Sequence, residues 1–282
     1  MQSSGFDLPP GSPDHCSSFF QFLSTHRPEL TPMARWGGQP ILQQRGPHDY
    51  QSSPFPQPVA HGTTVLAFKY ADGVLIAGDR RATEGFQIAE NRMEKVYKTD
   101  DFSAMAIAGA AGPCLEMAKL FSIELEHYEK LDGVQLSCEG KANRLGQMVK
   151  ANLPLVMQGL VVIPLFVGYD AKRAQGRIFK YDITGGRYEE TEFHSIGSGG
   201  KDARLLLKER YQKDLTEQAA VRIALRALAN AAEEDVGTGG PDPIRRIYPS
   251  MKVVSGQGVQ DIEESTLATL WEELVQTRRQ ES

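Results

Sequence analysis

The sequence predicts an α+β fold in which antiparallel β-sheets are covered by helices. Strand patterns occur in runs instead of alternating one by one with helices, and the first four strands form pairs joined by short turns. The helical segments that follow are amphipathic. Because strands and helices are grouped in this way, antiparallel sheets with external helices fit better than a parallel βαβ sheet. An apolar fraction of 40% in 282 residues is enough to build a substantial core.

The first 62 residues differ in composition from the rest of the chain. They hold ten of the sixteen prolines together with Ser- and Gln-rich tracts, and Phe19, Phe20 and Phe22 form a small apolar cluster among them. Such a segment cannot bury enough apolar surface to fold alone. We therefore predict an appendage over residues 1–62 and a folded domain over residues 63–282.

The first half of this domain predicts two hairpins and then two helices. Residues 63–70 and 74–79 are strand-like runs on either side of a short loop that contains Gly73, and a second pair is joined across residues 99–100. The second pair covers residues 93–98 and 102–109. Apolar residues then recur three or four apart over residues 113–131 and 139–153, which predicts two helices on one face of a sheet.

The second half predicts five more strands and two more helices. The strand patterns cover residues 161–170, 176–183, 188–198, 247–255 and 258–264. Asp214 is expected to cap an alanine-rich helix that runs to about Ala232, with Glu217 reaching back to the cap. A final helix from Ser265 carries Leu267, Leu270, Trp271 and Leu274.

Charge and cysteine content limit the partners and the compartment. The formal net charge of −5 and the absence of a Lys/Arg-rich stretch argue against nucleic acid and membrane surfaces as partners. Cys16, Cys114 and Cys138 are odd in number and spaced unlike a zinc or redox motif, which favours free thiols in a reducing compartment. We expect a cytoplasmic protein without a metal or other cofactor.

The predicted hairpins bring two opposite charges to the interior of a sheet. Pairing across residues 71–73 places Asp79 opposite the beginning of the first strand. In the second hairpin, the same arithmetic places Lys95 across from Met105 and Met93 across from Ile107. A buried Lys and a buried Asp are costly unless they pair, so each predicts the other as its partner. A purely structural salt bridge is the alternative interpretation.

Thr63 and Thr64 stand at the border between the appendage and the domain. Two threonines at the beginning of a strand are most often only good strand formers. Here, however, Gly62 precedes Thr63 at the end of a dispensable segment, so cleavage between them would create an N-terminal threonine. The α-amine of such a threonine can act as the base for its own hydroxyl. Thr63 is therefore a candidate nucleophile.

Several motifs agree in order and spacing with one known family. They are Gly62-Thr63-Thr64, AGDRRATEG (77–85), Glu94-Lys95-Val96, AIAGAAG (106–112), GSGG (197–200) and the run from Asp235 to Gly240. Over residues 62 to about 276 the chain resembles the β-subunit of the proteasome core particle, a threonine peptidase of the N-terminal-nucleophile hydrolase type. The long pro-segment and TGGPD (238–242) resemble the actinobacterial form. The resemblance implies a four-layer αββα sandwich.

The resemblance also implies a catalytic role for each of four residues. Thr63 would supply both the attacking hydroxyl and, through its amine, the general base. Lys95 would contribute positive charge beside them, and Asp79 would hold Lys95 in place. The backbone N–H of Gly109 would stabilise the oxyanion.

Further residues are implied to support the nucleophile or the substrate. Ser198, Asp235 and Thr238 would orient the amine of Thr63, although many relatives have serine at the position of Thr238. The implied apolar walls of the specificity pocket are Ala82, Met93, Ile107, Ala111 and Leu115, which favour cleavage after large hydrophobic residues. Thr83 and Ala111 would bind the main chain of an extended peptide.

Maturation and assembly follow from the same resemblance. Self-cleavage between Gly62 and Thr63 would remove residues 1–62 as a propeptide and leave residues 63–282 as a threonine-protease catalytic domain. The propeptide would assist assembly. Homoheptameric β-rings would stack with heptameric rings of α-subunits in a 28-subunit barrel, which a regulatory ATPase ring would contact through the α-subunits. The substrates would be unfolded polypeptides.

Two other functions are alternatives to this one. A noncatalytic ring subunit of the same fold would usually lack the threonine, the lysine or the cleavable glycine, and all three are present here. A simpler bacterial threonine protease forms double six-membered rings with a hexameric ATPase. It also begins Thr-Thr, but it lacks the long pro-segment and the final Leu/Trp helix.

Overall fold

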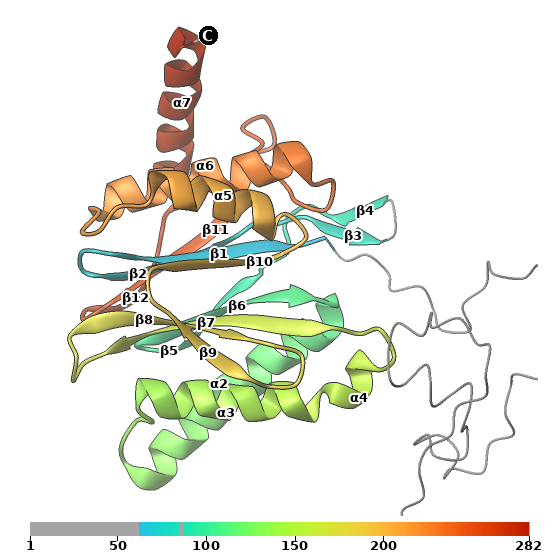
Figure 1. The fold of residues 1–282 in the computed structure, drawn as a ribbon, viewed down its shortest axis with the longest axis vertical. Coiled ribbons are helices and arrows are strands. Elements are labelled where there is room, and N and C mark those ends of the chain that lie inside the picture. Colours follow the sequence, from blue (N-terminus) through green and yellow to red (C-terminus); the bar gives the residue numbers. More distant parts are fainter. Residues whose placement is uncertain (1–61, 85–86, 282) are drawn as a thin grey trace, which may run out of the picture. The chain divides into compact units, whose positions relative to one another are not determined.

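A computed structural model describes residues 62–84 and 87–281. These residues form four layers, with two antiparallel sheets face to face and helices on both outer faces (Figure 1). The predicted α+β sandwich is therefore confirmed. The appendage before Gly62, with its Phe cluster and Cys16, lies outside the described residues. None of the helices in the described part of the chain is both long and apolar enough to cross a membrane.

The first sheet has the strand order β10-β1-β2-β11-β12. Its strands are β1 (Thr64–Tyr70), β2 (Gly73–Gly78), β10 (Phe193–Gly197), β11 (Ser250–Ser255) and β12 (Gly258–Asp261). The helices α5 (Gly200–Arg210) and α6 (Glu217–Glu234) cover its outer face, and α7 (Glu264–Glu281) packs on α6 (Figure 1). In β1, six of seven residues are buried because the strand has a sheet on one side and helices on the other.

The second sheet has the order β5-β6-β7-β8-β9. Its strands are β5 (Val96–Asp100), β6 (Ser103–Gly109), β7 (Val162–Asp170), β8 (Gln175–Tyr181) and β9 (Arg187–Glu190). The helices α2 (Ala111–Asp132) and α3 (Cys138–Ala151) cover the outer face, as predicted, and the short α4 (Leu153–Val156) follows α3. A separate ribbon of β3 (Ala82–Glu84) and β4 (Gln87–Glu90), which the sequence analysis did not predict, lies beside the sandwich (Figure 1).

Three apolar clusters hold the layers together. One lies between the two sheets and contains small and branched side chains such as Val65, Ile76 and Leu165. The other two lie between a sheet and its helices. In the α2–α3 cluster, the rings of Phe121 and Phe166 meet edge to face with their centroids 5.8 Å apart.

The first hairpin has the predicted register. Val65 pairs with Gly78, and the backbone N–H of Asp79 donates to the carbonyl oxygen of Thr64 at 3.0 Å. Asp79 therefore lies beside the beginning of β1, as the pairing arithmetic required.

The predicted register of the second hairpin is wrong by two residues. Met105 pairs with Tyr97, and Lys95 instead lies opposite Ile107, whose N–H donates to the Lys95 carbonyl at 3.2 Å. The chain turns later than expected, at Asp101 and Phe102, where the carboxylate of Asp100 accepts from the N–H of Phe102 at 2.9 Å, and a bulge follows Lys98. A two-residue shift keeps every side chain on the same face, so Lys95 still points toward the first sheet.

Two other element predictions are corrected, and one helix was not predicted. Residues 188–198 are two strands, because the chain bends after Glu190 and passes from β9 in one sheet to β10 in the other. The cap of α6 is Thr216, which accepts from Ala219 N–H at 3.3 Å, while Asp214 has a φ of 59° and lies before the helix. The helix α5 was not predicted, because only Gly200, Ala203 and Leu207 of its eleven residues are buried.

We expect Phe166→Ala to destabilise the domain strongly. Phe166 is fully buried between α2 and the second sheet, so truncation leaves a cavity that the surrounding side chains cannot fill. Thermal and denaturant unfolding should show a loss of about 3–5 kcal/mol. The control is Leu131→Ala, at a side chain that is 72% exposed, with an expected effect within about 0.5 kcal/mol. Equal losses in both variants would contradict this core assignment.

Candidate active site

Thr63 lies where β1 begins and β10 ends. It is 5% exposed, and the Gly62 residue before it is also buried. The Thr63 carbonyl accepts from the N–H of Ser198 at 2.9 Å. Gly197 has a φ of +100°, and a Cβ there would lie 1.8 Å from the Thr63 carbonyl oxygen, so only glycine allows the two chains to approach so closely.

The Thr63 side chain lies against the peptide bond between Gly62 and Thr63. The hydroxyl Oγ1 donates to the Gly62 carbonyl oxygen at 2.7 Å, and the N–H of Gly62 donates to Oγ1 of Thr83 at 2.9 Å. A Cβ on Gly62 would lie 2.1 Å from Cα of Gly237. The predicted cleavage site is thus held between β3 and the loop after α6.

A buried ion pair joins the first hairpin to the second. Nζ of Lys95 lies 2.7 Å from Oδ1 of Asp79, and their side chains are 2% and 0% exposed. The Asp79 carboxylate also accepts backbone N–H groups from Thr64 at 2.8 Å, Arg81 at 2.9 Å and Gly239 at 2.9 Å. Four donors therefore surround one carboxylate, which satisfies a buried charge that would otherwise be costly.

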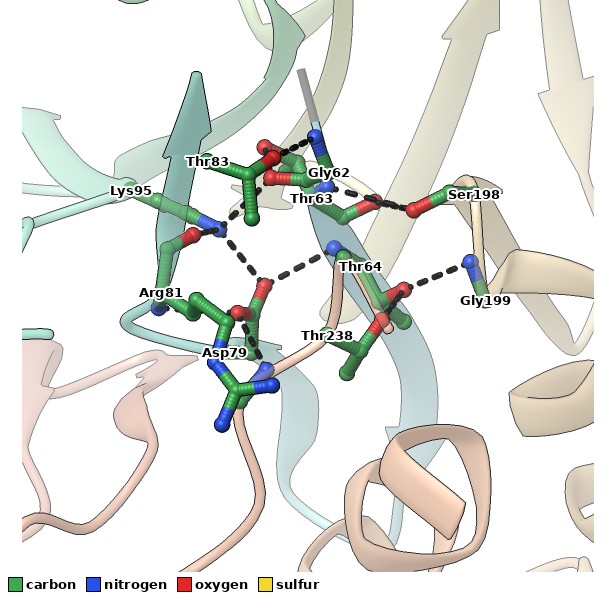
Figure 2. Close-up of polar contacts among 12 residues, drawn as sticks. Gly62, Thr63, Thr64, Asp79, Arg81, Thr83, Lys95, Ser198, Gly199 and Thr238 are labelled. Carbon is green, nitrogen blue, oxygen red and sulfur yellow. Dashed lines mark hydrogen bonds and ion pairs between the residues drawn. The ribbon is translucent and has the colours of Figure 1, made fainter. Parts of the chain in front are cut away.

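Lys95 extends from this pair to the peptide bond at Thr63. Its ammonium group also donates to the Arg81 carbonyl and, at 3.4 Å, to the carbonyl oxygen of Gly62 (Figure 2). Burial lowers the pKa of Lys95, and the attraction of Asp79 opposes that shift. Lys95 donates to Asp79, Arg81 and Gly62, which is the bonding of a charged ammonium group, and it therefore places positive charge beside the Thr63 hydroxyl.

A second network reaches the nitrogen of Thr63 from the other side. The N–H of Thr63 donates to Oγ of Ser198 at 3.3 Å. Ser198 and Thr238 both donate to Oδ2 of Asp235, each at 2.5 Å. The structure thus brings together all three residues that the resemblance implied near the amine.

One member of this network was missed by the sequence analysis. Oγ1 of Thr64 lies 2.6 Å from Oγ1 of Thr238 and accepts the N–H of Gly199 at 2.9 Å. The sequence indicates a strand former at Thr64 and a place in the Gly62-Thr63-Thr64 motif, but no contact of its side chain. Its partners lie 135 and 174 residues away in the chain, and no local sequence pattern predicts contacts over such a separation.

A small cavity opens beside the Thr63 side chain. Its lining includes Ala82, Met93, Ile107 and Ala111, four of the five wall residues that the resemblance implied, together with Gly62, Thr63, Thr83, Lys95 and Gly109. Glu94, Tyr97 and Cys114, which were not proposed as pocket residues, also line it. Leu115 does not line it and is 42% exposed, because successive residues of α2 are turned by about 100° and Cys114 faces the sheet instead.

Two details of the cavity wall bear on its chemistry. Gly109 has a φ of +135°, and a Cβ there would lie 1.9 Å from the Val161 carbonyl oxygen, so this backbone position requires glycine. Burial raises the pKa of the Cys114 thiol to about 12, so the thiol stays protonated near neutral pH. That protonation disfavours Cys114 as the attacking group.

Within residues 62–84 and 87–281, no three His, Cys, Asp or Glu side chains are grouped so that they could hold a metal ion. Cys114 and Cys138 are free thiols, and both are buried.

Comparison with known proteins shows which family the chain resembles. A family model described as proteasome subunit matches residues 59–244. A proteasome subunit beta from Acidimicrobium ferrooxidans is 54% identical over 222 residues, which cover 79% of this chain and 81% of the relative. Proteins of the same name from Acidothermus cellulolyticus and Streptomyces griseus are each 47% identical and cover 93% of this chain, with 87% and 88% of their own lengths matched.

The family match spans both halves of the site, from Thr63 and the Asp79–Lys95 pair to Asp235 and Thr238. It confirms the resemblance that the sequence motifs indicated. The chain belongs to the proteasome subunit family.

Proposed function

We propose that the chain is a catalytic beta subunit of a proteasome core particle and acts as a threonine-type endopeptidase. One observation carries this proposal: the buried Asp79–Lys95 pair meets the Gly62–Thr63 peptide bond at the point where the Thr63 hydroxyl lies 2.7 Å from the carbonyl oxygen. A structural salt bridge alone would not require a hydroxyl and a scissile glycine at its end. The relatives' shared name, proteasome subunit beta, supports the same assignment.

Self-activation is the first reaction in this mechanism. Oγ1 of Thr63 attacks the carbonyl carbon of Gly62 and loses its proton to a water molecule, while the ammonium group of Lys95, 3.4 Å from the Gly62 carbonyl oxygen, stabilises the negative charge that forms there. The C–N bond then breaks, the released nitrogen takes up a proton, and an ester joins Gly62 to Thr63. Water hydrolyses the ester, which frees the propeptide, residues 1–62, and gives the catalytic domain, residues 63–282, an N-terminal amine.

The same side chain then hydrolyses substrates. The neutral amine of Thr63 accepts the proton of Oγ1 as Oγ1 attacks a peptide carbonyl, and it later passes that proton to the leaving amine. The positive charge of Lys95 keeps the nearby amine neutral, and Asp79 holds Lys95 in place. Gly109 N–H stabilises the oxyanion. Ser198, which already contacts the Thr63 nitrogen, orients the amine with the help of Asp235 and Thr238.

The cavity beside Thr63 supports a preference for hydrophobic residues. Ala82, Met93, Ile107 and Ala111 form apolar walls near the nucleophile. Thr83 lies in β3, a short strand beside the cavity that can align an extended peptide through its main chain. We infer cleavage of unfolded polypeptides after large apolar residues.

Such broad specificity requires that the active sites be enclosed. We infer homoheptameric rings of this subunit stacked with heptameric α-subunit rings in the cytoplasm, with an ATPase ring acting through the α-subunits. The propeptide assists the assembly. No cofactor takes part in the mechanism.

The nucleophile is tested by Thr63→Ala, because alanine has no group that could attack. We expect intact-mass measurement to show that residues 1–62 stay attached. Peptidase activity should fall by about 10⁴-fold or more. Electron microscopy should still show rings of seven subunits. Thr63→Ser is the matched control, since it keeps a hydroxyl and should process itself. Peptide hydrolysis by the alanine variant would refute the mechanism.

The ion pair is tested by comparing one single and one double variant. Asp79→Asn leaves Lys95 buried without its counter-charge, so we expect a loss of about 3–5 kcal/mol in stability together with loss of self-cleavage. Asp79→Asn combined with Lys95→Met removes both charges and should recover much of the stability but none of the activity. Self-cleavage by the double variant at the wild-type rate would reduce the pair to a structural role.

The fit of Gly62 is tested by Gly62→Ala. Because the added Cβ would meet the Gly237 backbone at 2.1 Å, the scissile carbonyl must shift, and we expect self-cleavage to slow by about 10²-fold. The small fraction that matures should have normal activity per site, since residue 62 is then gone. Gly112→Ala is the control, because a Cβ there meets nothing within 4 Å. Full-rate processing of Gly62→Ala would contradict the placement of this bond.

A further inference from the structure

We propose that Thr64 is a positioning residue for the threonine nucleophile: its hydroxyl orients Ser198, and through Ser198 the nitrogen of Thr63, by way of Thr238 and Asp235. This inference rests on the function proposed above. It explains why a second threonine follows the first at the beginning of β1.

The four side chains form one continuous line of hydrogen bonds. From Thr64 to Thr238 the oxygen–oxygen distance is 2.6 Å, and from Thr238 to the Asp235 carboxylate it is 2.5 Å. The same carboxylate oxygen lies 2.5 Å from Oγ of Ser198, which is 3.3 Å from the Thr63 nitrogen. Figure 2 shows the Thr64 and Thr238 side chains directed at each other, below the Gly62–Thr63 bond in this view.

The donor of each hydrogen bond in this line can be assigned, because the Gly199 N–H at one end can only donate and the Asp235 carboxylate can only accept. The N–H of Gly199 can only donate, so the Thr64 oxygen accepts there. Thr238 donates to the Asp235 carboxylate, so its own proton is used. The proton between the two threonines must therefore come from Thr64. Ser198 likewise gives its proton to Asp235, which leaves a lone pair for the Thr63 nitrogen.

No other group can take the place of the Thr64 hydroxyl. Thr64 and Thr238 are both 0% exposed. A Cβ on Gly199 would lie 2.7 Å from both hydroxyl oxygens, which shows how closely the backbone packs against the pair. Since a valine methyl group would fill the space of the hydroxyl, water would not enter, and Gly199 N–H and the Thr238 oxygen would both lose their partner.

Thr64 also joins the two loops that carry the network. Gly199 precedes α5, whereas Asp235 and Thr238 follow α6, and the Thr64 hydroxyl is bonded to both segments. Without this hydroxyl, the two loops are held together less tightly, and the distance between Ser198 and Asp235 varies more. The backbone of Thr64 is independent of this effect, because its N–H remains bonded to Asp79.

The test is Thr64→Val in the assembled enzyme. We expect kcat to fall by about tenfold, which corresponds to about 1.4 kcal/mol in transition-state stabilisation. KM should not change, because Thr64 does not line the substrate cavity. A weaker bond from Thr238 leaves more negative charge on Asp235, which favours the protonated amine, so the acid limb of the kcat profile should move to higher pH. Thr64→Ser keeps the hydroxyl, so its kcat and the position of its acid limb should equal those of the wild type.

Thr99→Val is the matched control. Thr99 is also a buried strand threonine, 5% exposed, and its hydroxyl bonds to Ser103 at 2.8 Å in the β5–β6 turn, outside the described site. The Thr99→Val variant should be less stable than the wild type, with the same kcat and the same pH profile. If Thr64→Val does not assemble, Thr64→Ala and Thr64→Ser repeat the comparison with smaller side chains.

A double-mutant cycle with Thr238→Val decides whether Thr64 acts through Thr238. If it does, adding Thr64→Val to Thr238→Val causes little further loss of kcat, and additive losses would overturn the proposal. Wild-type kcat and pH profile in Thr64→Val would overturn it as well. If Thr63→Ala is inactive at the same time, the proposed function stands and only the role of Thr64 fails, whereas an active Thr63→Ala refutes the function itself.

Discussion

The buried ion pair between Asp79 and Lys95 is the constraint on which the rest of the site depends. Two full charges with almost no exposure are tolerated only if the surrounding backbone satisfies both. Three N–H groups do this for Asp79, and two carbonyl groups do it for Lys95. These partners come from β1, from the turn after β2, from the loop after α6 and from Gly62. Because Gly62 and β1 are continuous, satisfying one ion pair fixes the relative positions of three chain segments.

The peptide unit at Thr63 lies between two polar networks with different tasks. Lys95 reaches its carbonyl oxygen, whereas Ser198, held by Asp235, reaches its nitrogen. In the proposed mechanism, the first network stabilises the negative charge that forms on attack, and the second orients the amine after cleavage. Glycines at 62 and 197 make this possible, because a side chain at either position would collide with neighbouring backbone.

The four-layer scaffold supplies the rigidity that such a site needs. The first sheet supplies the candidate nucleophile on β1 and, through β2, the carboxylate, while Lys95 directly precedes β5 of the second sheet. The apolar cluster between the sheets therefore sets the distance between the two halves of the site. Membership of the proteasome subunit family agrees with this division, because the family match includes the strands of both sheets.

The sequence by itself determined the fold class, the first hairpin, the Thr63–Asp79–Lys95 combination and the family, because these depend on local periodicity, turn residues and motifs. Only the tertiary structure decided the shifted register at Lys95, the passage of residues 187–197 from one sheet to the other, and the position of Leu115 outside the cavity. It alone revealed Thr64 as part of the network around Asp235. A bulge, a change of sheet and a hydrogen bond across 174 residues depend on packing between distant segments, and alternation along the chain carries no information about such contacts.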